Sequence, residues 1–401
     1  MRLRVRAMAH GGEGIADAPD GRVVFVRGGV PGDVVDATLA KVKKRWARAD
    51  AVEVREPSPD RVEPTCPAAA AGAGCCDYSH IRPDAQVGFK RDILLGQLGA
   101  LSAHSGVLAG FDFDHLEVAQ LDPPTGWRTR VRLGIDSRGR AGMRRARSAD
   151  VVASSVCTQP VPGLLDGIVG EDARAFAPGA ELVVARDANG QRHVVQTHAA
   201  QRGRRVEAVQ RVLEGDGKVV ERVRGFDFVF PPTAFWQAHV RAPEAYSDTI
   251  ADWGRGEYAT PVGWDLYGGV GAFVPAISDA LGDGAVESVD YSDAAAAREQ
   301  QVTDAFNVRM HHGDVASTVS QLPKPGLVVL DPPRAGAGQD VVDAIADAAP
   351  QRVIHVGCDP ATFARDLAGF GNRGYAVTRL KLIDAFPNTH HFEVIAALER
   401  A

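Results

Sequence analysis

The chain has 401 residues, of which 45% are hydrophobic and 24% charged, a composition typical of a soluble globular protein with two or three domains. No apolar run approaches the roughly 18 residues of a membrane helix and the N-terminus lacks the apolar segment of a signal peptide, so we expect a cytoplasmic protein with no membrane partner. The net charge of −6 argues mildly against a nucleic-acid partner, although local basic patches decide such binding.

Residues 1–57 are predicted to form a small all-β module. Three strand-like runs, VVFV, VVDATLA and ADAVEV, are separated by turns rich in glycine, proline and lysine. The basic run Lys41–Arg48 contains Trp46. This run suits a solvated strand face as well as phosphate neutralisation with base stacking, and both interpretations stay open.

Residues 58–228 are predicted to form a middle region of mixed α and β structure. A helix is expected from Pro83 to Leu101, and strands are expected near the arginines and over Ala180–Thr197. Between Thr125 and Arg147 a single acid, Asp136, accompanies eight arginines, at positions 128, 130, 132, 138, 140, 144, 145 and 147. This segment is a second candidate RNA surface, with a solvated strand face as its alternative.

The cysteines of the middle region form a cluster. Cys66, Cys75 and Cys76 fall within eleven residues, and Cys157 follows the arginine-rich segment. In a reducing compartment such a cluster predicts a metal or iron–sulfur site before it predicts disulfides.

Residues 229–401 alternate short apolar strands with alanine-rich amphipathic helices, which predicts a parallel α/β sheet with crossover helices. The first clear strand ends in the turn Asp265–Gly271, whose glycines allow a close approach to a ligand. The next ends at Asp290, where a carboxylate can accept both ribose hydroxyls of a nucleoside. Because the turn lacks GxGxxG spacing, a dinucleotide is less favoured than a nucleotide or S-adenosylmethionine.

The later strand ends carry candidate chemistry. Asp331 precedes two prolines that force the chain out of the sheet, which holds its carboxylate beside the cofactor. Cys358 comes just before a predicted helix N-terminus at Pro360, where the pKa of a thiol can be lowered and its thiolate can act as a nucleophile. Glu393 adjoins the buried strand VIAAL, so we expect a raised pKa that suits proton abstraction.

With these elements in order, the chain resembles the RNA 5-methyluridine methyltransferase family over nearly its whole length. The segments GGEGIAD, GRVVFVRGGVPGDVV and KVKKRWARA are similar to a TRAM domain, a small OB-like barrel that binds RNA. The series Asp-Pro-Pro-Arg, Cys358 and Phe-Pro-x-Thr-x-His-x-Glu carries the rest of the resemblance. It implies an N-terminal barrel, a middle α+β domain and a Rossmann-like methyltransferase domain with a mostly parallel seven-stranded sheet.

The resemblance also implies residue roles. Cys358 matches the nucleophile and Glu393 the base, and the residues implied to bind S-adenosylmethionine are Gln237, Tyr267, Gly269, Asp290, Asp314 and Asp331. The implied reaction adds the thiolate to C6 of a uracil, methylates C5, removes the C5 proton and expels the cysteine. A stacked uracil cannot be reached, so the base must be flipped out or presented in a loop.

The chain departs from the family at several positions. Gly357 and Asp359 stand beside the nucleophile where serine and asparagine are usual, and Asp359 can raise the pKa of Cys358. Asp290 stands where glutamate is usual, and Ala272 where asparagine is frequent.

The cysteine pattern departs as well. Family members with a TRAM domain often bind a [4Fe–4S] cluster through Cys-x5-Cys-x2-Cys and a distant fourth cysteine. The resemblance aligns Cys66, Cys76 and Cys157 with this pattern, although one more residue than usual lies between Cys66 and Cys76. Counting back from Cys76, Ala73 occupies the second position, and Cys75 is the only candidate to replace it. The resemblance thus implies an iron–sulfur cluster, with zinc or no metal as alternatives.

Rival functions remain. A DNA cytosine C5 methyltransferase uses the same thiolate attack, but its nucleophile normally follows a proline, whereas Gly357 precedes Cys358 here. A non-catalytic RNA-binding iron–sulfur protein is the alternative of another class. Among RNA substrates, the barrel and the cysteines favour 23S rRNA over the T-loop of tRNA, and the resemblance suggests a monomer.

Overall fold

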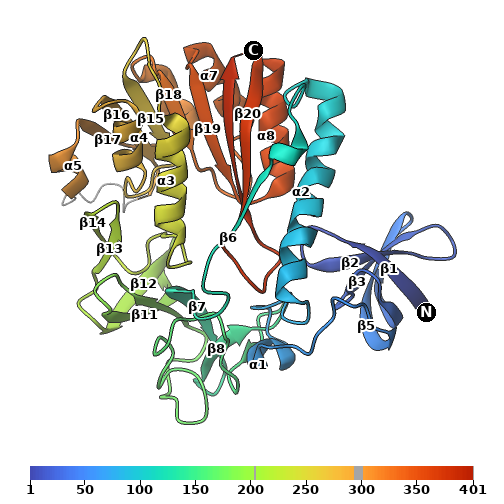
Figure 1. The fold of residues 1–401 in the computed structure, drawn as a ribbon. Helices are drawn as coiled ribbons and strands as arrows, with labels where there is room; N and C mark the ends of the chain where they lie inside the picture. Colours follow the sequence, from blue (N-terminus) through green and yellow to red (C-terminus); the bar gives the residue numbers. More distant parts are fainter. Residues whose placement is uncertain (203–204, 293–300, 401) are drawn as a thin grey trace.

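The computed structural model describes residues 1–202, 205–292 and 301–400. Figure 1 shows an N-terminal barrel, a middle antiparallel sheet and a large α/β layer, joined by the long helix α2 (Pro83–Ser105). This arrangement confirms the expected fold class.

Five strands close the N-terminal barrel in the order β1-β2-β3-β5-β4. They are β1 (Arg2–Met8), β2 (Glu13–Asp17), β3 (Val23–Arg27), β4 (Val34–Val42) and β5 (Trp46–Glu56). Side chains alternate between the two faces of a strand, so Leu3 and Val5 fill the barrel while Arg2 and Arg4 face solvent.

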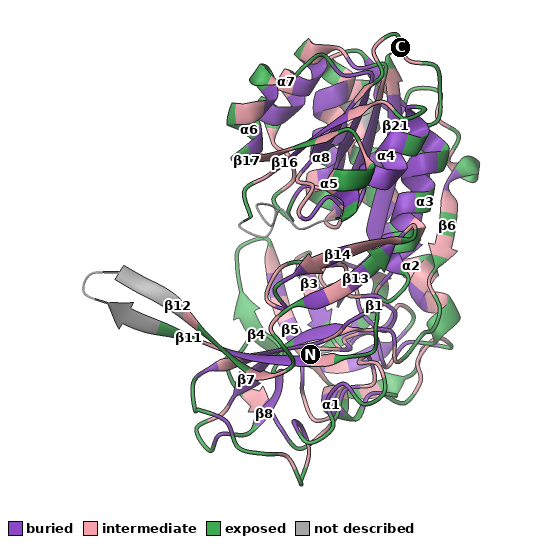
Figure 2. Ribbon diagram, turned by 90° about the vertical axis from the view of Figure 1, so that its left-hand side faces the viewer, coloured by how far each residue is buried: buried purple, intermediate pink, exposed green. Residues whose placement is uncertain are grey.

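The middle sheet has six strands in the order β12-β11-β10-β7-β8-β9. They are β7 (Arg130–Ile135), β8 (Ala141–Arg144), β9 (Val151–Val152), β10 (Glu181–Arg186), β11 (Arg192–Arg202) and β12 (Arg205–Glu214). The short helix α1 (Pro67–Ala70) lies beside it, and the hairpin of β13 (Val219–Val223) and β14 (Phe226–Phe230) follows it. In Figure 2 the coloured parts of β11 and β12 lead away from β7 and β8.

Many arginines of the segment expected to contact RNA are engaged within the protein. Arg130 pairs with buried Glu221 at 3.3 Å, and Arg147 pairs with Glu13 of the barrel at 2.9 Å. Two further arginines, Arg132 and Arg144, share the carboxylate of Glu181, at 2.9 and 2.6 Å. These pairs favour a structural role for the segment over phosphate neutralisation.

The C-terminal sheet has the order β17-β16-β15-β18-β19-β21-β20-β6. Its strands are β15 (Val262–Leu266), β16 (Ala285–Asp290), β17 (Val308–His312), β18 (Leu327–Leu330), β19 (Arg352–Gly357), β20 (Tyr375–Asp384), β21 (Glu393–Arg400) and β6 (Glu117–Gln120). The first five in the order are parallel, and β21 runs antiparallel to both of its neighbours. The expected seven strands are therefore joined by β6, which pairs in parallel with β20.

Helices cover both faces of this sheet. One face packs against α2, α7 (Gln339–Ala348) and α8 (Pro360–Asn372), and the other against α3 (Ala242–Gly254) and α4 (Val274–Ala280). The crossovers α5 (Gln301–Ala305) and α6 (Val315–Thr318) are short. A strand covered on both faces is apolar throughout, as the fully buried β18 is. Since α2 and β6 come from residues 58–228, the region expected as a middle domain also contributes to this layer.

None of the helices in the described part of the chain combines the length and the apolarity that crossing a membrane requires.

Candidate active site

Four parallel strands end at the same edge of the C-terminal sheet, where ligands lie in folds of this kind. Asp265 lies within β15 near its end, Asp290 ends β16, Asp331 follows β18 and Cys358 follows β19. The parallel order of the strands therefore gathers these four side chains at one edge.

The antiparallel strand β21 brings Glu393 to this edge. Gly357, the last residue of β19, pairs with Val394 of β21. Cys358 and Glu393 are the next residues outward on the two strands, so they lie opposite one another. The nucleophile and the base expected from the sequence are thus placed together.

The turn after β15 has the form of a cofactor loop. Tyr267 and Gly269 have positive φ angles of 62° and 58°, and the Gly269 N–H donates to Asp290 Oδ2 at 2.9 Å. A Cβ on Gly268 would lie 2.2 Å from Asp265 Oδ2, so only glycine fits there. A Cβ on Gly269 would meet no heavy atom within 4 Å, so the space beside the turn can receive a ligand.

Buried carboxylates lie at the same edge of the sheet as this turn. Gln237 Nε2 donates to Asp331 Oδ2 at 3.4 Å. Burial, and then the charge of Asp265, raises the pKa of Asp331 to about 7, and burial raises that of Asp265 to about 7. Among the described residues, Asp265 Oδ1 and Glu393 Oε2 are buried without a hydrogen-bond partner. This acidic donor set fits a positively charged ligand such as S-adenosylmethionine, since a cation offsets the cost of burying carboxylates.

Asp314, another expected cofactor residue, has a structural partner of its own. It caps α6, where its side chain accepts a hydrogen bond from Ser317 N at 3.1 Å. It also lies near Tyr267, whose pKa is raised to about 12 by burial first and by the charge of Asp314 next. The cofactor roles of Asp314 and Tyr267 remain predictions.

The electrostatics at Cys358 correct one expectation. Burial raises the pKa of the Cys358 thiol to about 12, and the charges of Glu393 and Asp331 add to this, while Arg334 acts in the opposite direction. The expectation that the helix N-terminus lowers this pKa is therefore wrong, because burial and negative neighbours outweigh it. The raised pKa expected for Glu393 is confirmed, and its causes are burial and then Asp331.

The two unusual residues beside Cys358 serve the adjoining helix. Asp359 accepts hydrogen bonds from Ala361 N and Thr362 N, both at 3.0 Å, and so caps α8. It is therefore not the carboxylate that raises the pKa of Cys358, which is Glu393 with Asp331. A Cβ on Gly357 would lie 2.5 Å from Phe363 Cδ2, so the packing of α8 requires glycine there.

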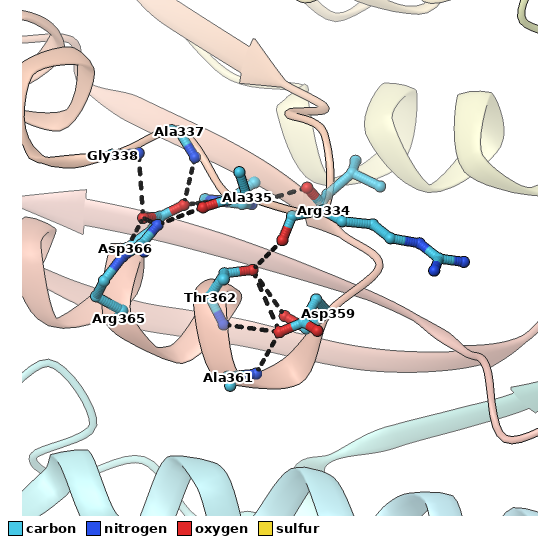
Figure 3. Close-up of polar contacts among 11 residues, drawn as sticks. Arg334, Ala335, Ala337, Gly338, Asp359, Ala361, Thr362, Arg365 and Asp366 are labelled. Carbon is cyan, nitrogen blue, oxygen red and sulfur yellow. Dashed lines mark hydrogen bonds and ion pairs between the residues drawn. The ribbon is translucent and has the colours of Figure 1, made fainter. Parts of the chain in front are cut away.

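Helix α8 also holds the loop that follows Asp331. As Figure 3 shows, Thr362 Oγ1 donates to the Arg334 carbonyl at 3.0 Å, and Asp366 accepts from Ala337 N at 2.6 Å and Gly338 N at 3.3 Å. The side chain of Arg334 extends away from these contacts in the same view. The positions of Asp331 and Cys358 are thus fixed relative to one another by bonds that the sequence did not reveal.

The loop before Glu393 is anchored by α2. Lys90 Nζ donates to Asp384 Oδ1 at 2.6 Å, and both side chains are fully buried. Gln86 accepts from Asn388 N at 2.9 Å and donates to Asn388 Oδ1 at 3.1 Å. Sequence reasoning missed these residues, although Lys90 lies within the helix expected from Pro83 to Leu101.

The turn between β1 and β2 reaches the same site. His10 Nε2 lies 2.9 Å from Asp359 Oδ2, and the His10 and His390 rings are 5.8 Å apart. His390 in turn binds Asp77, whose Oδ1 accepts from His390 N at 3.1 Å. The barrel, the cysteine segment and the loop before Glu393 therefore meet near Asp359, the residue that follows the nucleophile. The sequence did not predict this junction.

Cys66, Cys75, Cys76 and Cys157, here called the four-cysteine cluster, also come together. Their sulfur atoms all lie within 4.8 Å of one another, and Cys66, Cys76 and Cys157 are buried. The four residues expected to share a metal are therefore placed to do so.

Comparisons with known proteins agree with this geometry. Residues 1–52 match the TRAM domain, and residues 300–401 match the family described as tRNA (Uracil-5-)-methyltransferase. A protein of Corynebacterium glutamicum named "uncharacterized RNA methyltransferase" is 50% identical over 405 residues, which cover 99% of this chain and 96% of that protein. A protein of Streptomyces coelicolor with the same description is 36% identical over 433 residues, covering 100% and 92%.

Solved structures show the same fold. The crystal structure of the Pyrococcus abyssi tRNA (uracil-54, C5)-methyltransferase, in complex with S-adenosyl-L-homocysteine, superposes with a TM-score of 0.73 at 20% identity and covers 99% of both chains. From its relatives and its domains, the chain belongs to the family of RNA methyltransferases in which a TRAM domain precedes a uracil-5-methyltransferase domain.

Proposed function

We propose that this protein transfers a methyl group from S-adenosylmethionine to C5 of a uridine in RNA through a covalent bond to Cys358. The observation that carries the proposal is the pairing of Cys358 with Glu393 across β19 and β21, beside Asp331. A nucleophile and a base set opposite one another are what methylation of an unreactive pyrimidine carbon requires.

The chemistry follows from these side chains. Bound S-adenosylmethionine supplies an electrophilic methyl group on a positively charged sulfur. The Cys358 thiolate adds to C6 of the uracil, and the π electrons of the C5–C6 double bond form an enolate. C5 would then take the methyl group as its bond to the donor sulfur breaks, with S-adenosylhomocysteine as the leaving group. The Glu393 carboxylate then removes the C5 proton, the C5–C6 double bond reforms and the C6–S bond breaks, which returns the thiolate.

Arg334 has a part in this scheme. Its positive charge lowers the pKa of both Cys358 and Glu393, against the larger effect of burial. Both groups act in their ionised forms, so a nearby cation favours the reactive state. A cationic donor held by Asp265 and Asp331 would add to this effect.

The barrel offers a surface for RNA. Lys41, Lys43, Lys44 and Arg45 are exposed where β4 turns into β5. Trp46 lies beside them, with Lys41 Nζ 5.9 Å and Arg48 Cζ 5.8 Å from its ring centroid. Exposed cations around an aromatic ring suit phosphate contacts and base stacking.

The substrate that we propose to test first is 23S rRNA, which the barrel and the cysteines favour, with the T-loop of tRNA as the alternative. Labelled methyl transfer to rRNA and tRNA from cells lacking this protein, followed by mass spectrometry of the nucleosides, distinguishes the two. We expect 5-methyluridine in one RNA with the wild-type protein and none with Cys358→Ala. Transfer that survives this substitution rules out the covalent mechanism, and the absence of transfer to any RNA supports the non-catalytic RNA-binding alternative.

A further inference from the structure

We propose that the four-cysteine cluster binds a single tetrahedral metal ion, of which Zn²⁺ is the most suitable, and not the [4Fe–4S] cluster that the resemblance implies. The inference concerns the middle region and does not depend on the proposed function. It rests on the distances between the sulfur atoms, on the packing of the segment that carries them and on the neighbouring charge.

The sulfur positions match one central ion. Cys66 Sγ lies 3.9 Å from both Cys75 Sγ and Cys157 Sγ, and Cys76 Sγ lies 3.5 Å from Cys157 Sγ. In a tetrahedral zinc site, Zn–S bonds of about 2.3 Å place the sulfurs about 3.8 Å apart. In a cubane each thiolate binds a different iron and points away from the centre, which separates the sulfurs by about 6 Å. No pair in this cluster exceeds 4.8 Å.

The segment around Cys75 has little room to widen. Gly74 N donates to the Arg144 carbonyl at 2.9 Å, and a Cβ on Gly74 would lie 3.0 Å from Ala146 Cα. Gln159 also donates to the Cys75 carbonyl. These contacts hold the backbone on both sides of Cys75, so moving this segment outward to cubane distances would act against them.

An arginine beside the cluster balances the negative charge of ionised sulfurs. Arg128 interacts electrostatically with Cys75, Cys76 and Cys157, while its guanidinium donates to Gln159 Oε1 at 3.1 Å. Four thiolates around one divalent ion carry a net charge of about −2, and buried charge of this size needs a partner. The arginine therefore favours a metal-bound cluster over four neutral thiols.

The ion would be structural. Cys66 immediately precedes α1, Cys75 and Cys76 lie in the loop after α1, and Cys157 comes after β9. One ion bound to all four cysteines would therefore join three separate segments. Asp77, the residue after Cys76, binds His390 in the loop that leads to Glu393. Zinc has no redox chemistry, which agrees with a role in holding this loop.

The test is the metal and sulfide content of the full-length protein, expressed in iron-replete medium and purified without oxygen. We expect about one zinc per chain, no acid-labile sulfide and no broad visible absorbance. Replacement by Co²⁺ should give the d–d spectrum of a tetrahedral tetrathiolate site. Cys66→Ser should lower the bound metal severalfold, whereas Cys358→Ser, which alters a cysteine outside the cluster, should retain it.

Other results overturn the proposal. Four irons and four sulfides per chain, either after purification or after reconstitution with iron and sulfide, establish a cubane. A protein that binds neither zinc nor cobalt, whether its cysteines are free thiols or a disulfide, shows that the cluster holds no metal.

Discussion

The cysteines of this protein occupy two contrasting environments. Cys358 has no other cysteine beside it. Its charged neighbours are the carboxylates of Glu393 and Asp331, and Arg334 opposes their effect on its pKa. The cysteines of the four-cysteine cluster face one another and Arg128. The same side chain thus lies beside carboxylates in one place and beside other thiols in the other. The neighbours rather than the residue type decide which chemistry we propose for each.

The largest expected effect tests the pairing of Cys358 with Glu393. In Glu393→Gln the adduct forms and accepts the methyl group, but the C5 proton is not removed, so we expect turnover to fall about 1000-fold. A protein–RNA species that survives denaturing electrophoresis and carries labelled methyl should accumulate. The double variant with Cys358→Ala should lack this species, and its persistence there would contradict the assignment of the nucleophile.

The pH dependence of kcat/KM tests the electrostatic environment of Cys358. Burial raises the pKa of Cys358 to about 12, so at neutral pH its protonated, inactive form is favoured and the thiolate increases with pH. The pKa of Glu393 is raised as well, which acts in the same direction. We expect kcat/KM to rise by up to about tenfold per pH unit between pH 6 and 8. A profile that is flat or falls over this range would contradict the raised pKa values.

A smaller catalytic effect is expected at the four-cysteine cluster. Cys157→Ser removes a ligand, so we expect a fall in Tm of several degrees. Because the cluster takes no part in the reaction and is linked to the loop before Glu393 through Asp77 and His390, kcat should change less than about tenfold. A chelator should lower the Tm of the wild-type protein and leave that of the variant nearly unchanged, and an equal chelator effect on both proteins would argue against a stabilising metal.

The smallest expected effect concerns the contact between the barrel and the nucleophile. Burial lowers the pKa of His10, so a neutral ring donates to Asp359, the residue after Cys358. Losing this bond in His10→Ala should lower kcat about fivefold, which corresponds to roughly 1 kcal/mol. Arg6→Ala, which removes a barrel ion pair with Asp17 at 2.8 Å, is the matched control and should leave kcat unchanged. Equal losses in both variants would point to destabilised folding of the barrel.

Much of the candidate site followed from sequence because strand ends can be recognised locally. Apolar runs that stop at Asp265, Asp290, Asp331 and Cys358 predicted a shared sheet edge, since parallel strands end on the same side. The pKa of Cys358 was misjudged because the helix N-terminus is visible in the sequence, whereas the burial of the thiol is not.

Contacts between distant segments could not be predicted. Lys90 is 294 residues from Asp384, and His10 is 349 residues from Asp359. Nothing in the local pattern around any of these residues names its partner, because a hydrogen bond across the fold depends on how whole layers pack.

The sequence by itself determined the barrel, the α/β layer, the family and the residues that stand at the sheet edge, because apolar periodicity and turn residues act over short stretches of chain. Tertiary structure alone decided that Glu393 faces Cys358, that Asp359 caps a helix and binds the barrel, and that four sulfurs lie within 4.8 Å of one another. Charges and distances at these places depend on segments that meet only when the chain has folded.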